Sequence, residues 1–207
     1  YFDYKRFPEN DYHGLGELER AFYGLMNKLC EMGIGHHFLD ETILAKHARV
    51  EGKSLVVGKC RYDYIILPKM YTMDKSTDQL LSEFVHNDGK ILLTDKKPGF
   101  LEGRRYNYVY LRSNTTFDEI LENEPCKISN NKNVRITYRK DENGRDFIYC
   151  VNLGEEATVD FKLKNGSSFE NYDIISDTYS VISTSVHFDK GESRLLYISN
   201  KKPDAIK

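Results

Sequence analysis

The stretch Tyr64-Ile65-Ile66-Leu67-Pro68 is a continuous apolar run that ends at a proline. A second run of this kind, Lys90-Ile91-Leu92-Leu93-Thr94, follows further along the chain. Such runs are typical of strands that are buried on both faces of a parallel sheet. Between the two runs, apolar residues have the spacing of one buried helical face. They are Leu80, Leu81, Phe84 and Val85. A helix between two buried strands predicts a parallel sheet with a crossover connection.

The same alternation extends on both sides of this unit. Apolar residues recur at three- and four-residue steps from Leu15 to Met32, and Gly33 ends the helix that they predict. Short strand candidates follow at His37–Leu39 and Ser54–Val57, and Tyr106–Leu111 alternates like an edge strand. We therefore expect a parallel, doubly wound α/β sheet in the first part of the chain.

Beyond Ser113-Asn114-Thr115-Thr116 the pattern changes to strand after strand, with a short bridging helix at 117–121 that Pro125 ends. Asp141-Glu142-Asn143-Gly144 and Lys164-Asn165-Gly166 supply hairpin turns. About seven short strands with frequent turns predict an antiparallel β-sandwich. They are Val134–Tyr138, Phe147–Asn152, Thr158–Leu163, Phe169–Asp173, Val181–Ser183, Ser185–Phe188 and Arg194–Ile198.

Composition excludes two classes of partner. The 207 residues hold 30 Lys and Arg against 32 Asp and Glu, so the net charge of −2 offers no field for a phosphate backbone. No apolar run approaches the ~20 residues of a membrane span. We expect no nucleic-acid partner and no membrane span.

The chain opens at Tyr1 without a Met and closes on Lys207, so we expect a piece of a longer protein.

Catalytic signatures are missing from the places where an α/β domain carries them. Gly14-Leu15-Gly16 lacks the third glycine of a dinucleotide loop. The turns Pro68-Lys69-Met70-Tyr71 and Thr94-Asp95-Lys96-Lys97-Pro98 hold no Ser or Cys for a nucleophile elbow. Counting cannot exclude a carboxylate pair for glycoside hydrolysis, but it singles out none. We predict no catalytic, cofactor-binding or metal-binding residue.

Two further residue classes have a structural and a functional interpretation. Cys30, Cys60, Cys126 and Cys150 lie beside apolar residues without a C-x-x-C pair, so we expect buried, unreactive thiols. Tyr-rich stretches such as Tyr62-Asp63-Tyr64 and 105–110 either stack on sugars or pair across strands, and pairing is the commoner reason.

One polar connection remains a candidate site. His36, His37, Asp40 and Glu41 lie in one connection at the end of a predicted strand, where α/β sheets present ligand-facing loops. Neighbouring strand residues point to opposite faces, so His36 and His37 do not readily share a metal. The structural interpretation is one buried and one solvated histidine. The functional interpretation is an interface with a neighbouring domain, and we predict an inter-domain interface at these four residues.

The order of these signals resembles a known module. The segments that carry the resemblance are 18–41, Gly52–Gly58, Tyr62–Pro68 and Leu80–Leu93, and then Asp146–Asn152, Tyr172-Asp173 with Asp177, and Gly191–Ile198. Together they resemble the C-terminal region of large bacterial glycoside hydrolases of the rhamnosidase-like and β-galactosidase-like kind. In those enzymes a flavodoxin-like domain related to class I glutamine amidotransferases follows the catalytic barrel. A C-terminal β-domain comes after the flavodoxin-like domain.

The resemblance implies a flavodoxin-like parallel sheet flanked by helices over residues 1–115. It implies a linker with a short helix at 116–125, a small antiparallel β-sandwich at 126–200 and a tail at 201–207. Where amidotransferases carry a nucleophilic Cys, the strand ending at Thr94 continues into Asp95-Lys96-Lys97, so glutaminase activity is not expected.

Two functional hypotheses follow. In the first, the chain is a non-catalytic accessory fragment of a glycoside hydrolase, with a scaffold, inter-domain or oligomerisation role beside an upstream catalytic barrel. In the second, it is an independent carbohydrate-binding module or a small stand-alone α/β enzyme. The resemblance implies the upstream catalytic domain, a second copy of the chain and the parent's carbohydrate substrate as partners. It also implies a periplasmic or secreted bacterial parent, and no cofactor.

Overall fold

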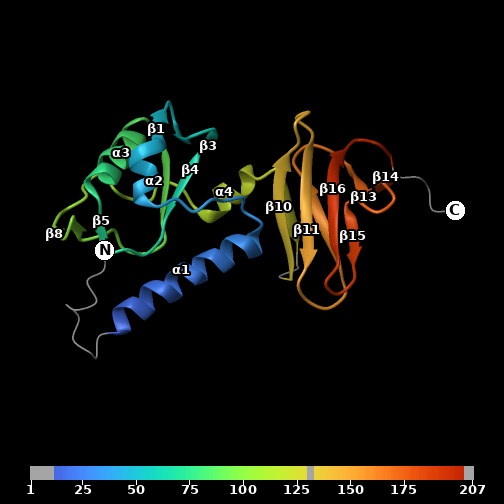
Figure 1. Ribbon diagram of the computed structural model, residues 1–207, viewed down its shortest axis with the longest axis horizontal. Coiled ribbons are helices and arrows are strands. Elements are labelled where there is room, and N and C mark those ends of the chain that lie inside the picture. The colour runs from blue at the N-terminus through green and yellow to red at the C-terminus, as the bar shows by residue number, and fades with distance from the viewer. Residues whose placement is uncertain (1–11, 130–132, 203–207) are drawn as a thin grey trace. The chain divides into compact units, whose positions relative to one another are not determined.

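The computed structural model of the protein describes residues 12–129 and 133–202 (Figure 1). The chain divides into two compact units. The first holds the chain up to Met26 and His37–Ile120, and the second holds Asn27–His36 and the chain from Leu121 onward. The expected domain boundaries near residues 115 and 126 stay a prediction.

The first unit combines helices with several small sheets. The long helix α1, Tyr12–Met32, begins in it, and α2, Glu41–His47, and α3, Lys75–His86, lie wholly within it. Its strands form three groups: the antiparallel meander β1 (Ala48–Glu51), β2 (Ser54–Val57) and β3 (Cys60–Tyr62); the parallel pair β4 (Tyr64–Leu67) and β6 (Lys90–Leu93); and the short β5 (Thr72–Met73), β7 (Phe100–Leu101) and β8 (Arg104–Arg105).

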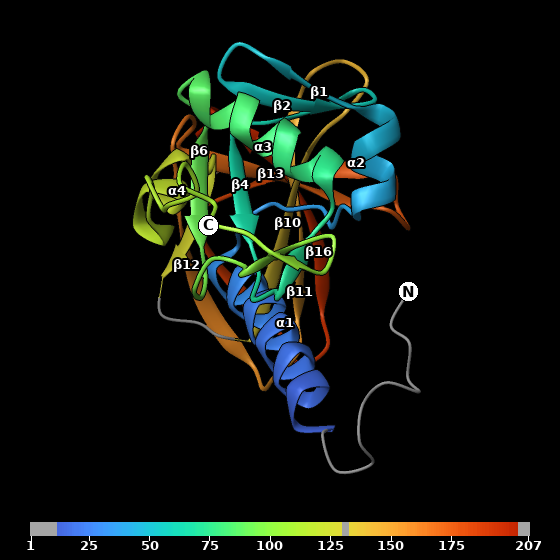
Figure 2. The ribbon, with the colours of Figure 1, turned by 90° about the vertical axis from the view of Figure 1, so that its left-hand side faces the viewer.

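The predicted helix between the two apolar runs is present, and it covers the parallel pair. Figure 2 shows α3 running across β4 and β6. Leu81 and Phe84 on its inner face are 1% and 0% exposed. They pack with Leu67 and Ile91 in one apolar cluster. Asp88 then takes a left-handed φ of 61°, and Gly89 lies so close to the Phe84 ring that a Cβ would approach it to 2.5 Å.

The flavodoxin-like parallel sheet flanked by helices was a wrong prediction. The parallel pairing of β4 with β6 is real, but their sheet has two strands. Ser54–Val57 pairs instead within an antiparallel meander, where Gly52 at φ 59° makes the turn between β1 and β2. The hydrophobic run of a strand predicts its burial but not its partner, and here tight glycine turns select the nearest neighbours.

The expected edge strand at Tyr106–Leu111 is absent as well. Side chains take the place of a strand beside β6: Ser113 Oγ accepts from Leu93 N at 2.9 Å and Asn114 Oδ1 accepts from Ile91 N at 2.7 Å. Tyr108 is fully buried, and its hydroxyl donates to the Phe100 carbonyl at 2.7 Å. Of the alternating tyrosines of this segment, Tyr108 belongs to the core, Tyr110 packs partly against it and Tyr106 is exposed, and none of them is in a strand ladder.

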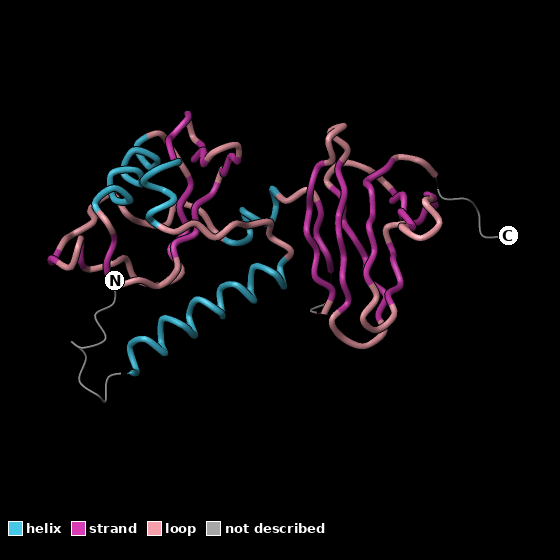
Figure 3. Tube along the Cα trace, in the orientation of Figure 1, coloured by secondary structure: helices cyan, strands magenta, loops and turns pink. Residues whose placement is uncertain are grey.

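The second unit is built mainly of strands, which Figure 3 draws in magenta, and their pairings are antiparallel. One sheet has the order β10 (Val134–Lys140), β11 (Asp146–Asn152), β16 (Ser193–Ser199), β13 (Ser168–Asp173) and β14 (Thr178–Ile182). The other has the order β15 (Ser185–Phe188), β12 (Ala157–Leu163) and β9 (Cys126–Ser129). The short helix α4, Phe117–Asn123, precedes β9.

Both sheets contribute to one apolar core. Ile148, Phe169 and Leu196 come from the five-stranded sheet, and Val159 and Phe161 come from the three-stranded sheet. The Phe161 and Phe169 rings meet edge to face with centroids 5.2 Å apart. This arrangement is partly consistent with the predicted antiparallel sandwich. The inner face of the five-stranded sheet is therefore buried in this core. The outer face of the same sheet does not contribute to it.

Candidate functional site

Each predicted interface residue has a hydrogen-bond partner within the chain. His36 Nδ1 lies 2.8 Å from the Ile34 carbonyl oxygen. His37 Nδ1 lies 2.7 Å from Tyr62 Oη, at the end of β3. His36 belongs to the second unit and His37 to the first. These contacts give both imidazoles a structural partner on the chain itself.

The two carboxylates of the connection organise helix starts. Asp40 is the N-cap of α2, and its Oδ1 accepts from Ile43 N at 2.8 Å and from the Thr42 hydroxyl at 2.6 Å. The Thr42 hydroxyl and the Ile43 amide lower the pKa of Asp40. Glu41 Oε1 accepts from Asp74 N at 2.8 Å, just before α3. Such caps satisfy backbone donors that a helix start leaves open. The interface at these residues stays a prediction.

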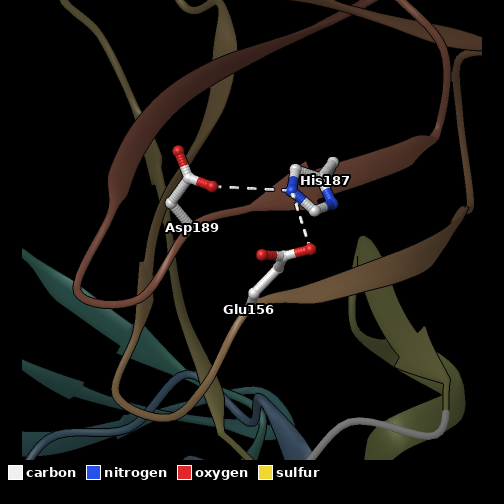
Figure 4. Close-up of side chains that lie close together, drawn as sticks. All are labelled: Glu156, His187 and Asp189. Atoms are coloured by element: carbon white, nitrogen blue, oxygen red, sulfur yellow. Dashed lines mark ion pairs between the residues drawn. The ribbon is translucent and has the colours of Figure 1, made fainter.

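A cluster that sequence reasoning missed lies at one end of β12 and β15. Figure 4 shows His187 pointing between two carboxylates, with Nε2 3.6 Å from Asp189 Oδ1 and 4.0 Å from Glu156 Oε1. Thr158 stands opposite His187 in the strand register, and its Oγ1 lies 3.2 Å from His187 Nδ1. The ligand atoms of the three residues lie within 4.8 Å of one another.

This cluster has the donor set of a divalent-cation site, but its environment is that of exposed ion pairs. The side chains of Glu156, His187 and Asp189 are 73%, 50% and 78% exposed. Buried Asn152 holds the flanking loops together, because its Nδ2 donates to the carbonyls of Glu155 and Asp189. Only the pairing of β12 with β15 brings residues 156 and 187 together, so no local motif could have signalled the cluster.

One surface hollow among the described residues lies in the first unit and has a volume of about 680 Å³. Both of its lysines are in ion pairs: Lys53 Nζ lies 3.3 Å from Asp88 Oδ2, and Lys90 Nζ lies 3.5 Å from Glu119 Oε1. Its walls come from Lys53, Asp63, Tyr64, Val85, Asp88, Lys90, Arg112 and Asn114. Apart from Tyr64 and Val85, these are polar or charged side chains.

The second hollow lies in the second unit and has a volume of about 290 Å³. It adjoins the outer face of the five-stranded sheet. Its lining includes two tyrosines together with charged and amide side chains: Arg145, Asn165, Glu170, Tyr179, Tyr197 and Asn200. This hollow brings two tyrosine rings together with hydrogen-bonding groups of both kinds, which is the usual composition of a small-molecule site.

Four rings line up across the strands beside this hollow, and we call them the aromatic row. The ring centroids are 5.4 Å apart for Phe147 and Tyr197, 5.7 Å for Tyr197 and Tyr179, and 4.9 Å for Tyr179 and Tyr172. The Arg145 guanidinium carbon lies 4.5 Å from the centroid of Tyr197 and 5.9 Å from that of Tyr179. Sequence reasoning missed this row, since its members come from four separate strands.

Comparisons with known proteins find likeness at the level of structure. No family model and no curated protein matches the chain. The structure is similar to an apo exo-carrageenase GH42 from Bacteroides ovatus, with a TM-score of 0.60 and 16% identity over 87% of this chain and 26% of that chain. It is also similar to a rhamnosidase from Novosphingobium sp. PP1Y, with a TM-score of 0.55 and 15% identity over 79% of this chain and 20% of that chain.

The chain thus spans about a quarter or less of the solved chains that it resembles. At these identities the likeness concerns the fold. It agrees with the expected likeness to part of a glycoside hydrolase, whereas the glutamine amidotransferase-like domain finds no support. Among the described residues, no helix has both the length and the apolar character to span a membrane.

Proposed function

We propose that this chain is a non-catalytic accessory region of a larger glycoside hydrolase, and that it serves as a scaffold or inter-domain element beside a catalytic barrel. The observation that carries the proposal is the uneven coverage of the structural neighbour. The match takes in 87% of this chain but 26% of the exo-carrageenase, so most of that enzyme lies outside it. A (β/α)₈ barrel needs roughly 200 residues or more, which neither unit of this chain supplies.

The carboxyl groups at the second hollow support a non-catalytic role. Glycoside hydrolysis needs a general acid whose pKa is raised. The Lys201 ammonium and the Ser199 hydroxyl lower the pKa of Glu170. Burial acts to raise the pKa of Asp146, but Lys140 and Tyr138 hold it below its ordinary value. Both groups are therefore held as carboxylates by their own partners.

Glu124 does not fill the missing role of the acid. Burial raises its pKa to about 7, and the Gly35 amide acts in the opposite direction. It lines neither of the two hollows. A raised pKa without a place for a sugar beside it does not make a catalytic acid.

The test is an assay of the purified 207-residue chain with a panel of aryl glycosides and with glutamine. We expect no turnover above that of buffer. Steady turnover that is lost in Glu170→Gln or in Asp146→Asn would contradict a non-catalytic role.

A further inference from the structure

We propose that the hollow beside the aromatic row is a carbohydrate-binding site, in which one pyranose ring of a neutral sugar chain stacks on Tyr179. This inference deepens the proposed function, and it rests on that function for the choice of a carbohydrate as the ligand. The site itself is derived from the second unit alone.

The aromatic row lies on the outer face of the five-stranded sheet. Successive strand residues point to opposite faces. Ile148, Phe169, Ile182 and Leu196 contribute to the inner core. Their neighbours Phe147 and Tyr197 therefore point outward, and so do Tyr172 and Tyr179, which lie three residues from Phe169 and Ile182. Figure 1 shows β16, β13 and β14 side by side, so the outward rings form one continuous surface.

Tyr179 is the ring with an open face. It is 46% exposed, although it is paired in register with Tyr172 on β13. Cross-strand pairing accounts for the alignment of the two rings but leaves much of Tyr179 in contact with water. The Arg145 guanidinium lies nearer the neighbouring Tyr197 ring. Tyr179 therefore offers an apolar surface to a ligand. It does so at the edge of a hollow whose other sides are lined by protein side chains.

Two charged groups of the hollow, Arg145 and Glu170, have hydrogen-bond partners in the chain before any ligand binds. Arg145 Nε donates to Asp141 Oδ2 at 2.7 Å, which holds the guanidinium above the tyrosines. Glu170 accepts from Ser199 Oγ at 3.0 Å and from Lys201 Nζ at 2.8 Å. The amide side chains of Asn165 and Asn200 complete the lining with both donors and acceptors.

These features match the chemistry of a pyranose. One face of the ring presents C–H groups, which pack on an aromatic face, while its edge carries hydroxyls that donate and accept. Because Arg145 and Glu170 already have charged partners in Asp141 and Lys201, the site has no unpaired charge to attract an ion. A volume of about 290 Å³ lies at the lower end for ligand pockets, and it suits a single sugar unit of a longer chain.

The experiment is calorimetric titration of the full chain with three probes: cellotetraose, a neutral galactan tetrasaccharide and a sulfated galactan tetrasaccharide. Tyr179→Ala removes the stacking surface, and Tyr179→Phe keeps the ring without its hydroxyl. Tyr149→Ala is the matched control, since Tyr149 is equally exposed at 46% on the same sheet but does not line the hollow. Thermal unfolding of each variant verifies that it is folded.

We expect at least one neutral probe to bind saturably. Tyr179→Ala should weaken that binding by about tenfold or more, while Tyr179→Phe and Tyr149→Ala change it by less than about threefold. Three results would overturn the inference: no saturable binding of any probe, an equal loss in Tyr149→Ala, or binding of the sulfated probe alone. The first would leave the accessory role untouched, because that role is tested on the natural polypeptide and on turnover.

Discussion

Cys60 differs from the other cysteines in its contact with solvent. It is exposed at the start of β3, whereas Cys126 and Cys150 are buried and Cys30 is half-buried. Burial raises the pKa of Cys126 to about 12 and also raises that of Cys150. The prediction of four buried thiols was therefore wrong for Cys60, because the short strand that carries it turns its side chain outward.

We predict one fast-reacting thiol in the native protein. Reactivity follows access and thiolate formation, and both are suppressed at Cys126 and Cys150. Titration with a chromogenic disulfide should show a single fast phase that Cys60→Ser abolishes, and the buried thiols should react only after unfolding. A fast phase that survives Cys60→Ser would contradict this assignment.

Glu124 should make the free energy of unfolding depend on pH. Its folded pKa of about 7 lies above the ordinary value of 4.5, so the native state holds the proton more tightly than the unfolded chain. Stability from this group is therefore complete below pH 4.5 and falls as the pH rises towards 7. Partial exposure screens the effect to about 1–2 kcal/mol.

The variant Glu124→Gln isolates this contribution. It should be more stable than the native sequence by about 1–2 kcal/mol at pH 8 and nearly equal to it at pH 4. Urea unfolding at the two pH values measures the difference. A gain of the same size at both would show that ionisation is not its cause.

At the scale of elements, β4 contributes one buried residue to the apolar cluster of the first unit. Leu67 at its end is 7% exposed and belongs to the cluster that contains Phe84 and Ile91. Its carbonyl also accepts from Thr94 N at 3.1 Å. Truncation of a buried leucine removes apolar contact and leaves a cavity.

We predict that Leu67→Ala lowers the free energy of unfolding by ~2–5 kcal/mol. Val109→Ala is the control, because Val109 is 81% exposed and should change stability by less than ~0.5 kcal/mol. Denaturant unfolding measures both variants. A loss below ~1 kcal/mol for Leu67→Ala would mean that the cavity closes or that β4 is not central.

Elements were more predictable from the sequence than their arrangement. The spacing of Leu81 and Phe84 predicts α3, and the expected strand positions beyond Val134 largely match the observed ones, because local periodicity reports burial directly. The partners of Ser54–Val57 depend on turn geometry and on competition between strands. The aromatic row depends on register across four strands, so neither could be predicted from one segment.

The expected site residues illustrate the same limit at a smaller scale. Asp40 is predicted to lie at an inter-domain interface, which stays a prediction, and its position before α2 also makes it an N-cap. That capping role could have been predicted, since an Asp before a short helix is a standard start signal. The Glu156, His187 and Asp189 cluster could not, because strand pairing alone assembles it.

At the scale of the whole molecule, we propose that the chain is part of a larger enzyme. Two units of different architecture lie within 207 residues, and together they match a fraction of much longer glycoside hydrolase chains. A scaffold role and a sugar-binding role are compatible in such a region. The scaffold role depends on the two folded units as a whole, whereas sugar binding needs only the outer face of the five-stranded sheet.

The most direct test of the accessory role is to identify the natural polypeptide that contains this chain. Antibodies raised against the purified chain should detect, in cells that carry its gene, a polypeptide several times larger, and they should deplete a glycoside-hydrolysing activity from the extract. A polypeptide of the size of the chain itself, whose depletion leaves that activity unchanged, would contradict the account.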